Sequence, residues 1–146
     1  MKHEQDLAER AVRRLHERDI AARTLGIEVA GVAVGYAKCT MRVRDDMLNG
    51  HGICHGGVIF TLADTTFAFA CNSYNDKTVA TSASIEFLAP VQSGDELTAE
   101  ADERARGRRL GVYDIEVRNQ AGARIALFRG RSAKISGSVV EGVAGE

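Results

Sequence analysis

The chain has 146 residues, with 19 Lys and Arg against 20 Asp and Glu, so its formal net charge at pH 7 is -1. This length fits one domain that buries its own core without a metal or disulfide, and the balanced charge excludes a general affinity for nucleic acid or anionic membranes. The three cysteines are an odd number and lack Cys-x-x-Cys spacing, which indicates reduced, mostly buried thiols.

The N-terminal region is charged and has no apolar stretch of the length that a secretion signal requires, so we expect a cytoplasmic protein. Residues 5–20 repeat apolar side chains at helical spacing, which predicts an amphipathic helix. Residues 24–34 are strand-like but interrupted by glycines, and residues 37–43 predict a second strand.

Residues 56–72 form the most apolar stretch, GGVIFTLADTTFAFACN, and contain no proline. A buried strand is the alternative for such a run, because Phe and Thr are mediocre helix formers, but its length favours a buried central helix. Alternating patterns then predict strands at residues 78–88, 97–106 and 110–119, with a last strand ending near 135.

We expect these strands to form an antiparallel meander. The fold class predicted is α+β, a curved antiparallel sheet around the central helix. No repeat or second domain is visible, so residues 1–137 are predicted to be one domain and residues 138–146 a flexible tail.

Asp64 is the one ionisable side chain, cysteine aside, between Gly56 and Cys71. Burial of an ionised carboxylate without a partner is costly and raises its pKa, which prepares it for nucleophilic or general-base work. The structural alternative is that Asp64 lies on a solvated stripe or bonds a neighbouring threonine, Thr61 or Thr65.

The motif His51-Gly-Ile-Cys54-His55-Gly56-Gly57 directly precedes this helix. Glycines at a helix start leave backbone N–H groups approachable, and the helix dipole adds positive potential there, as in an oxyanion hole. A plain glycine turn is the structural alternative. Zinc ligation by the histidines and Cys54 is a further alternative, although the spacing matches no standard zinc site.

Gly56 and Asp64 lie eight residues apart, about 12 Å along a helix. Groups that act on one carbonyl must approach it within about 3 to 3.5 Å. If both act on one carbonyl, they must therefore come from two subunits, which predicts an obligatory dimer.

The stretch MLNGHGICHGGVIFTLADTTFAFACNS, together with ASIEFLAPVQSGDELTAEA, GVYDIEVRNQ and ALFRGRSAKI, resembles the hotdog-fold thioesterases. Within them it is most similar to the phenylacetyl-CoA thioesterases of bacterial phenylacetate degradation. The resemblance implies that the Gly56 amide polarises the thioester carbonyl, that Asp64 is nucleophile or general base, and that Asn49 and His55 lie at the site. It also implies dimers paired into a tetramer. Where some relatives hold water with a threonine, this chain has Ala68, and Thr65 is a candidate substitute.

For substrate binding we single out Gly57, Phe60, Thr65 and Phe67, although aromatic residues at helical spacing are more often core. Arg pairs well with phosphate, so Arg108, Arg109 and Arg131 are candidates to bind coenzyme A. Charged residues also commonly protect hairpins and sheet edges, which is the structural alternative for each.

The expected function is hydrolysis of phenylacetyl-CoA or a ring-hydroxylated relative to free acid and CoA. No metal and no cofactor are expected, since CoA is part of the substrate. The partners expected are this small-molecule substrate and further copies of the chain, with no nucleic acid and no membrane. Two alternatives stay open: a thioesterase for another aryl or medium-chain acyl-CoA, and a non-catalytic acyl-CoA-binding module.

Overall fold

The computed structural model describes residues 1–141 of the chain. Its helices are α1 (Lys2–Arg18), α2 (Ile20–Thr24) and α3 (Gly56–Asn72), with a short 3-10 turn at Asp45–Met47. Its strands are β1 (Glu28–Ala33), β2 (Tyr36–Arg42), β3 (Asp76–Phe87), β4 (Glu96–Arg106), β5 (Leu110–Arg118) and β6 (Arg124–Ser138). The predicted α+β architecture is confirmed, and α3 begins and ends where the apolar stretch predicted.

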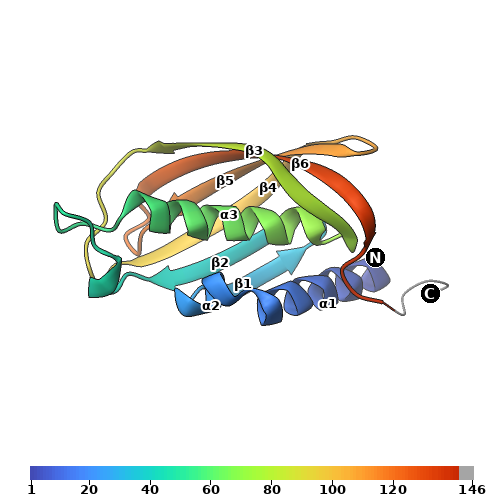
Figure 1. Cartoon of the computed structure of the whole chain (residues 1–146), viewed down its shortest axis with the longest axis horizontal. Helices are drawn as coiled ribbons and strands as arrows, with labels where there is room; N and C mark the ends of the chain where they lie inside the picture. The colour runs from blue at the N-terminus through green and yellow to red at the C-terminus, as the bar shows by residue number, and fades with distance from the viewer. Residues whose placement is uncertain (142–146) are drawn as a thin grey trace.

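The curved sheet wraps around α3, with α1 and α2 beyond it on the open side (Figure 1). Because α3 packs against strands on several sides, ten of its residues are buried, which explains why its sequence is apolar almost all round. The alternation in β4 and β5 has the expected cause, since Leu97, Ala99 and Ala101 point into the core while the residues between them point outward.

The strand order is β1-β2-β4-β5-β6-β3, with every neighbouring pair antiparallel. The expected meander is therefore wrong for β3, which does not pair with β4. It pairs along its length with β6 and forms one edge of the sheet. Only β4, β5 and β6 follow one another as a meander, because alternation fixes which face a strand buries but does not fix its neighbour.

The N-terminal helical region differs from the single helix predicted at residues 5–20. It forms two helices that break at Asp19, whose side chain accepts a hydrogen bond from the Ala22 amide at 3.0 Å and caps α2. None of the helices in residues 1–141 is long and apolar enough to cross a membrane.

The predicted flexible tail is wrong for residues 138–140. The amides of Val139 and Val140 donate to Asn75, to its carbonyl at 3.0 Å and to its Oδ1 at 2.8 Å, and both side chains pack beside Ala11 of α1. Burial of the two valines outweighs the glycine-rich composition that suggested disorder. The rest of the predicted tail, residues 142–146, lies outside the described residues.

Candidate active site at the start and middle of one helix

The loop before α3 is held by its own side chains. Oδ1 of Asn49 accepts from the amides of His51 and Ile53 at 2.9 and 3.3 Å. His55 has extended backbone, and its Nδ1 accepts from the Gly57 amide at 2.8 Å, which caps the helix. The sequence predicted Asn49, His55 and Gly57 as site residues, and the structure places all three at the start of α3, where they shape the backbone.

The first amide of the helix is free to bind a ligand. His55 accepts from Gly57, and within residues 1–141 the Gly56 N–H has no acceptor. A Cβ built on Gly56 would lie 3.1 Å from the ring of Phe87, so glycine permits this close packing. An unpaired N–H at a helix N-terminus carries partial positive charge and suits an oxyanion.

Asp64 lies two turns further along α3 and is half-buried. Thr61, which could have bonded it, donates to the Gly57 carbonyl at 2.8 Å instead. Within the described residues the Asp64 carboxylate has no hydrogen bond and no ion pair. The alternative in which Asp64 bonds a neighbouring threonine is therefore not observed in α3.

The electrostatic surroundings of Asp64 favour its protonated form. Burial raises the pKa of the Asp64 carboxyl, and the negative charge of Asp19 raises it further. Such a shift, on a carboxylate without a structural partner, is typical of groups that take part in acid–base or nucleophilic chemistry.

Of the aromatic residues predicted to line the substrate pocket, Phe67 lies in the core and Phe60 is partly buried against it. Phe67 is 1% exposed and packs against Tyr113 and Phe128, with ring centroids 5.7 and 5.9 Å apart, and Phe60 meets the edge of Phe128 at 5.2 Å. The prediction is corrected for Phe67, because the close approach of β6 at Gly130 leaves no room for a ligand beside it. Thr65 is buried next to Asp64.

A groove of about 480 Å³ opens beside the second half of α3 instead. Ala68 and Asn72 line it from α3, and Leu15 and Asp19 line it from the N-terminal helices. Sequence reasoning missed this groove. Ala68 and Asn72 lie one and two turns beyond Asp64, so helical spacing could have placed them on the same face of α3 as Asp64. The contribution of α1 could not be predicted, because it depends on the packing of segments far apart in the chain.

The three arginines predicted to bind CoA do not surround Asp64. Arg108 and Arg109 lie in the turn between β4 and β5, and Arg131 lies on β6 opposite Ser82 of β3. All three are exposed. Within one subunit the structure therefore brings neither this group nor the Gly56 amide to the Asp64 carboxylate.

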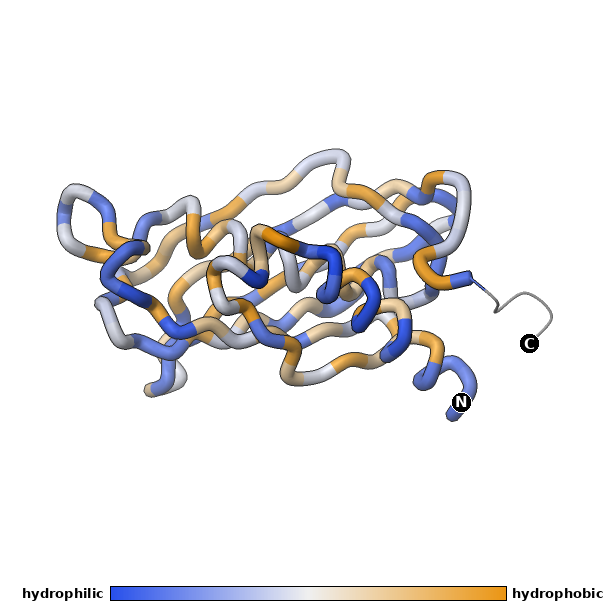
Figure 2. The backbone as a smooth tube through the Cα atoms, turned by 60° about the horizontal axis from the view of Figure 1, so that its bottom comes forward, coloured by the Kyte–Doolittle hydropathy of each residue, from blue (hydrophilic) through white to orange (hydrophobic). Residues whose placement is uncertain are grey.

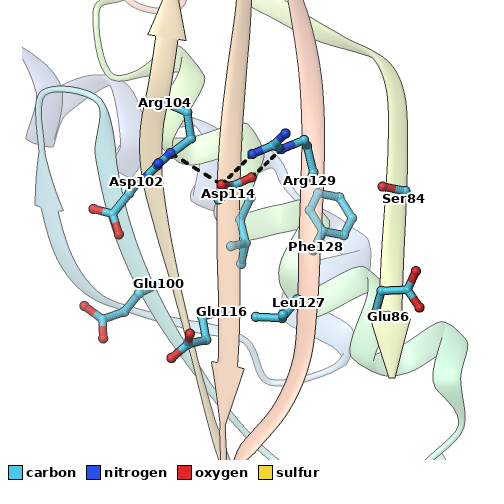
Figure 3. A pocket seen from close by; sticks show the side chains of 11 residues that line it. Ser84, Glu86, Glu100, Asp102, Arg104, Asp114, Glu116, Leu127, Phe128 and Arg129 are labelled. Atoms are coloured by element: carbon cyan, nitrogen blue, oxygen red, sulfur yellow. Dashed lines mark hydrogen bonds and ion pairs between the residues drawn. The ribbon is translucent and has the colours of Figure 1, made fainter. Parts of the chain in front are cut away.

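A second hollow, of about 550 Å³, lies on the outer face of the sheet and is shown in Figure 3. Its two arginines, Arg104 and Arg129, both pair with Asp114, the latter at 2.6 Å. Its remaining charged side chains are all acidic: Glu86, Glu100, Asp102 and Glu116. An anionic substrate such as an acyl-CoA is repelled there, so this hollow is less suited to it than the groove beside the second half of α3.

The zinc alternative has no geometric support. Across residues 1–141, no group of three His, Cys, Asp or Glu side chains is gathered as metal ligands would be. Cys54 is buried, which raises the pKa of its thiol to about 11.

Comparisons with known proteins agree with this geometry. Residues 51–126, which hold the loop, α3 and most of the sheet, match the model of the Thioesterase superfamily. The acyl-coenzyme A thioesterase PaaI of Escherichia coli K12 is 49% identical over 125 residues, covering 86% of this chain and 89% of that protein. The chain belongs to the Thioesterase superfamily, which confirms the resemblance and the hotdog fold.

Solved structures extend the match to three dimensions. The structure of the E. coli PaaI protein from the phenylacetic acid degradation operon superposes with a TM-score of 0.90 at 46% identity, covering 92% of this chain and 97% of that one. A Streptococcus mutans protein bound to acetyl CoA superposes with a TM-score of 0.73 at 28% identity, covering 77% and 90%. The chain is thus a thioester hydrolase by family and fold.

Proposed function

We propose that this protein hydrolyses aryl acyl-CoA thioesters, with phenylacetyl-CoA or a ring-hydroxylated phenylacetyl-CoA as substrate, to the free acid and CoA. The observation that carries the proposal is the half-buried, unpaired Asp64 carboxylate on α3, in a chain that matches PaaI over most of its length. The acyl-CoA thioesterase named in E. coli and the CoA-bound relatives support the substrate class.

In this proposal the start and the middle of α3 divide the chemistry. The Gly56 amide binds the carbonyl oxygen and stabilises the negative charge that develops on it. Asp64 either attacks the carbonyl carbon itself, expelling the CoA thiolate and forming a mixed anhydride that water then hydrolyses to the free acid, or takes the proton from a water whose oxygen attacks the carbonyl and displaces the CoA thiolate. Asn49, whose Oδ1 is already occupied by two amides, has its amide nitrogen left to contact the acyl group or the water.

The proposed site is shared between two subunits, because one helix separates Gly56 from Asp64 by about 12 Å. The exposed edge of β3 supports a dimer. Val79 on this strand and Phe87 and Leu88 at its end are 46, 52 and 51% exposed, and within residues 1–141 the outer edge of β3 has no partner strand. Assembly of such dimers into a tetramer, and a cytoplasmic location, stay predictions from the sequence.

Release of free thiol from a panel of acyl-CoAs tests the proposal. We expect phenylacetyl-CoA and its ring-hydroxylated forms to give the highest kcat/KM, with shorter and longer straight-chain esters below them. A preference for medium-chain esters would show that the substrate is not an aryl acyl-CoA, while thioester hydrolysis would remain the reaction. Stoichiometric CoA-ester binding without turnover of any ester would instead favour the non-catalytic binding module.

A further inference from the structure

A hollow of about 360 Å³ lies at the start of α3, beside the Gly56 amide. Gly56 and Ile59 line it from α3, Asn49 lines it from the preceding loop, and residues 87–91 line it from the end of β3 onward. Within residues 1–141, no Asp, Glu, Lys or Arg lines this hollow. It therefore offers mostly apolar walls beside an oxyanion donor, which suits an uncharged acyl group.

Backbone hydrogen bonds tie the walls of the hollow together. The Cys54 amide donates to the Val91 carbonyl at 2.8 Å, which joins the loop before α3 to the segment after β3. The Leu88 amide donates to the Ile125 carbonyl at 2.8 Å, which holds the end of β3 against β6. The backbone on both sides of the hollow is therefore fixed without a ligand.

The register of β3 turns Phe87 toward the helix. Hydrophobic and hydrophilic residues alternate along much of the sheet in Figure 2, because successive side chains of a strand point to opposite faces. Ile85, opposite Phe128 of β6, packs against the core, and Glu86 lines the hollow on the outer face in Figure 3. Phe87 follows Glu86 and therefore lies on the inner face with Ile85.

Phe87 places an uncovered aromatic ring at the Gly56 amide. Its Cζ and Cε1 atoms lie 3.1 and 3.4 Å from the position of a Cβ on Gly56, so the tip of the ring abuts the start of the helix. The residue is nevertheless 52% exposed. Phe60 and Phe67, by contrast, both pack against Phe128. Of the described residues, Phe87 is thus the aromatic one that lines the hollow.

The position of this ring matches the shape of an aryl acyl group. When the Gly56 amide binds the carbonyl oxygen, the acyl substituent begins at the adjacent carbonyl carbon, and the ring of a phenylacetyl group follows after a single methylene. Two aromatic rings prefer offset or edge-to-face contacts with centroids about 4.5–7 Å apart. A saturated ring of the same size gains the burial of apolar surface without this contact.

We propose that Phe87 is a specificity-determining residue for thioester hydrolysis, with its ring packed against the aryl ring of the acyl group while the Gly56 amide binds the carbonyl oxygen. The inference rests on the proposed function and names the side chain that selects the acyl group. It moves the aromatic contact from Phe60 and Phe67 on α3 to the end of β3.

A cycle that removes each of the two rings in turn tests the inference. Wild type and Phe87→Leu are each assayed with phenylacetyl-CoA and with cyclohexylacetyl-CoA, whose ring is saturated. The wild type should favour the phenyl ester in kcat/KM by roughly two- to tenfold, the range of an aromatic pair beyond its area burial, and Phe87→Leu should lose this preference. Leu88→Ala, at a second exposed apolar residue of the same hollow, is the matched control and should keep it.

A wild type without the preference, an undiminished preference in Phe87→Leu, or its loss in Leu88→Ala as well would overturn the inference. A variant that is merely less stable or less well assembled loses activity toward both esters alike, so the ratio isolates the contact between the rings. Dissociation constants of the two ketone analogues, in which a methylene separates the carbonyl from the sulfur, repeat the cycle without turnover. A wild type that hydrolyses no ester but shows the same ring-dependent ratio of dissociation constants would refute the proposed function and leave the inference standing.

Discussion

The start and the middle of the catalytic helix contribute to the site in different ways. At its start, Gly56 offers a backbone amide, and the side chains around it serve to hold that amide free: His55 caps Gly57, and Asn49 orders the loop. Two turns later, Asp64 offers a side chain whose reactivity depends on burial and on a neighbouring charge. The Gly56 amide acts through backbone geometry, and the Asp64 carboxylate acts through its burial and a neighbouring charge.

This difference determines which substitutions disrupt the Gly56 amide and which disrupt the Asp64 carboxylate. A backbone donor is insensitive to side-chain chemistry and is lost only when its hydrogen is removed or the turn is displaced. A buried carboxylate is lost by any substitution that removes its charge, and it is tuned by distant groups that change its pKa. Substitutions at Gly56 and at Asp64 therefore separate the geometric from the electrostatic contribution to catalysis.

The largest effect is expected from Asp64→Asn. It keeps the size of the side chain and removes its nucleophilic and basic character, so kcat should fall by roughly 10⁴-fold, the upper end of what a positioned general base supplies. Steady-state thiol release with the preferred ester measures it. Turnover equal to that of the wild type would remove Asp64 from its assigned role.

Thermal melts provide the control for this variant. The pKa of Asp64 is raised in the folded state, so its stability contribution is fully present below the unfolded pKa of about 3.9 and is lost as pH rises through the folded value. At pH 8 the ionised group therefore destabilises the fold. Asp64→Asn should melt at or above the wild-type temperature there, and the difference should shrink toward pH 4.

A smaller loss is expected from Gly56→Pro, which removes the amide hydrogen. The extended backbone of His55 is the conformation allowed before proline, and proline is favoured at the first helical position, so the helix should form. The loss of one oxyanion donor should lower kcat by roughly 10²–10³-fold. Gly56→Ala is the matched control, because it adds a Cβ against Phe87 and keeps the N–H.

Mixing the same Gly56→Pro protein with Asp64→Asn sharpens the comparison. In a heterodimer one of the two shared sites regains both an intact amide and an intact carboxylate, so activity should recover to as much as half of the wild-type value per dimer. No recovery in a verified heterodimer would contradict the shared site.

The smallest effect is expected from Asp19→Asn. Asparagine caps a helix as well as aspartate does, so α2 should keep its hydrogen bond to the Ala22 amide while the charge that raises the Asp64 pKa disappears. The acidic limb of the kcat profile should move to lower pH by less than about one unit. Asp46→Asn, at an exposed acid paired with Arg44, is the control and should leave the limb in place.

Much of the fold could be read from periodicity. The apolar run of α3, the alternation of β4 and β5 and the glycine motif each predict an element that the structure contains. The position of β3 beyond β6 and the docking of Val139 and Val140 could not be predicted, because both depend on contacts between segments far apart in the chain. The same limit applied to Phe67, whose helical spacing fits a pocket and a core equally well.

The sequence by itself determined the reacting groups, which are a lone acid in an apolar helix and a glycine pair at the start of that helix. Both are local patterns, and a local pattern can be recognised without knowledge of the tertiary packing. The tertiary structure decided which faces of that helix are open. Because α1 packs against α3, Leu15 of α1 and Ala68 of α3 line one groove although they lie more than fifty positions apart in the chain, and no periodicity within either helix predicts that they meet.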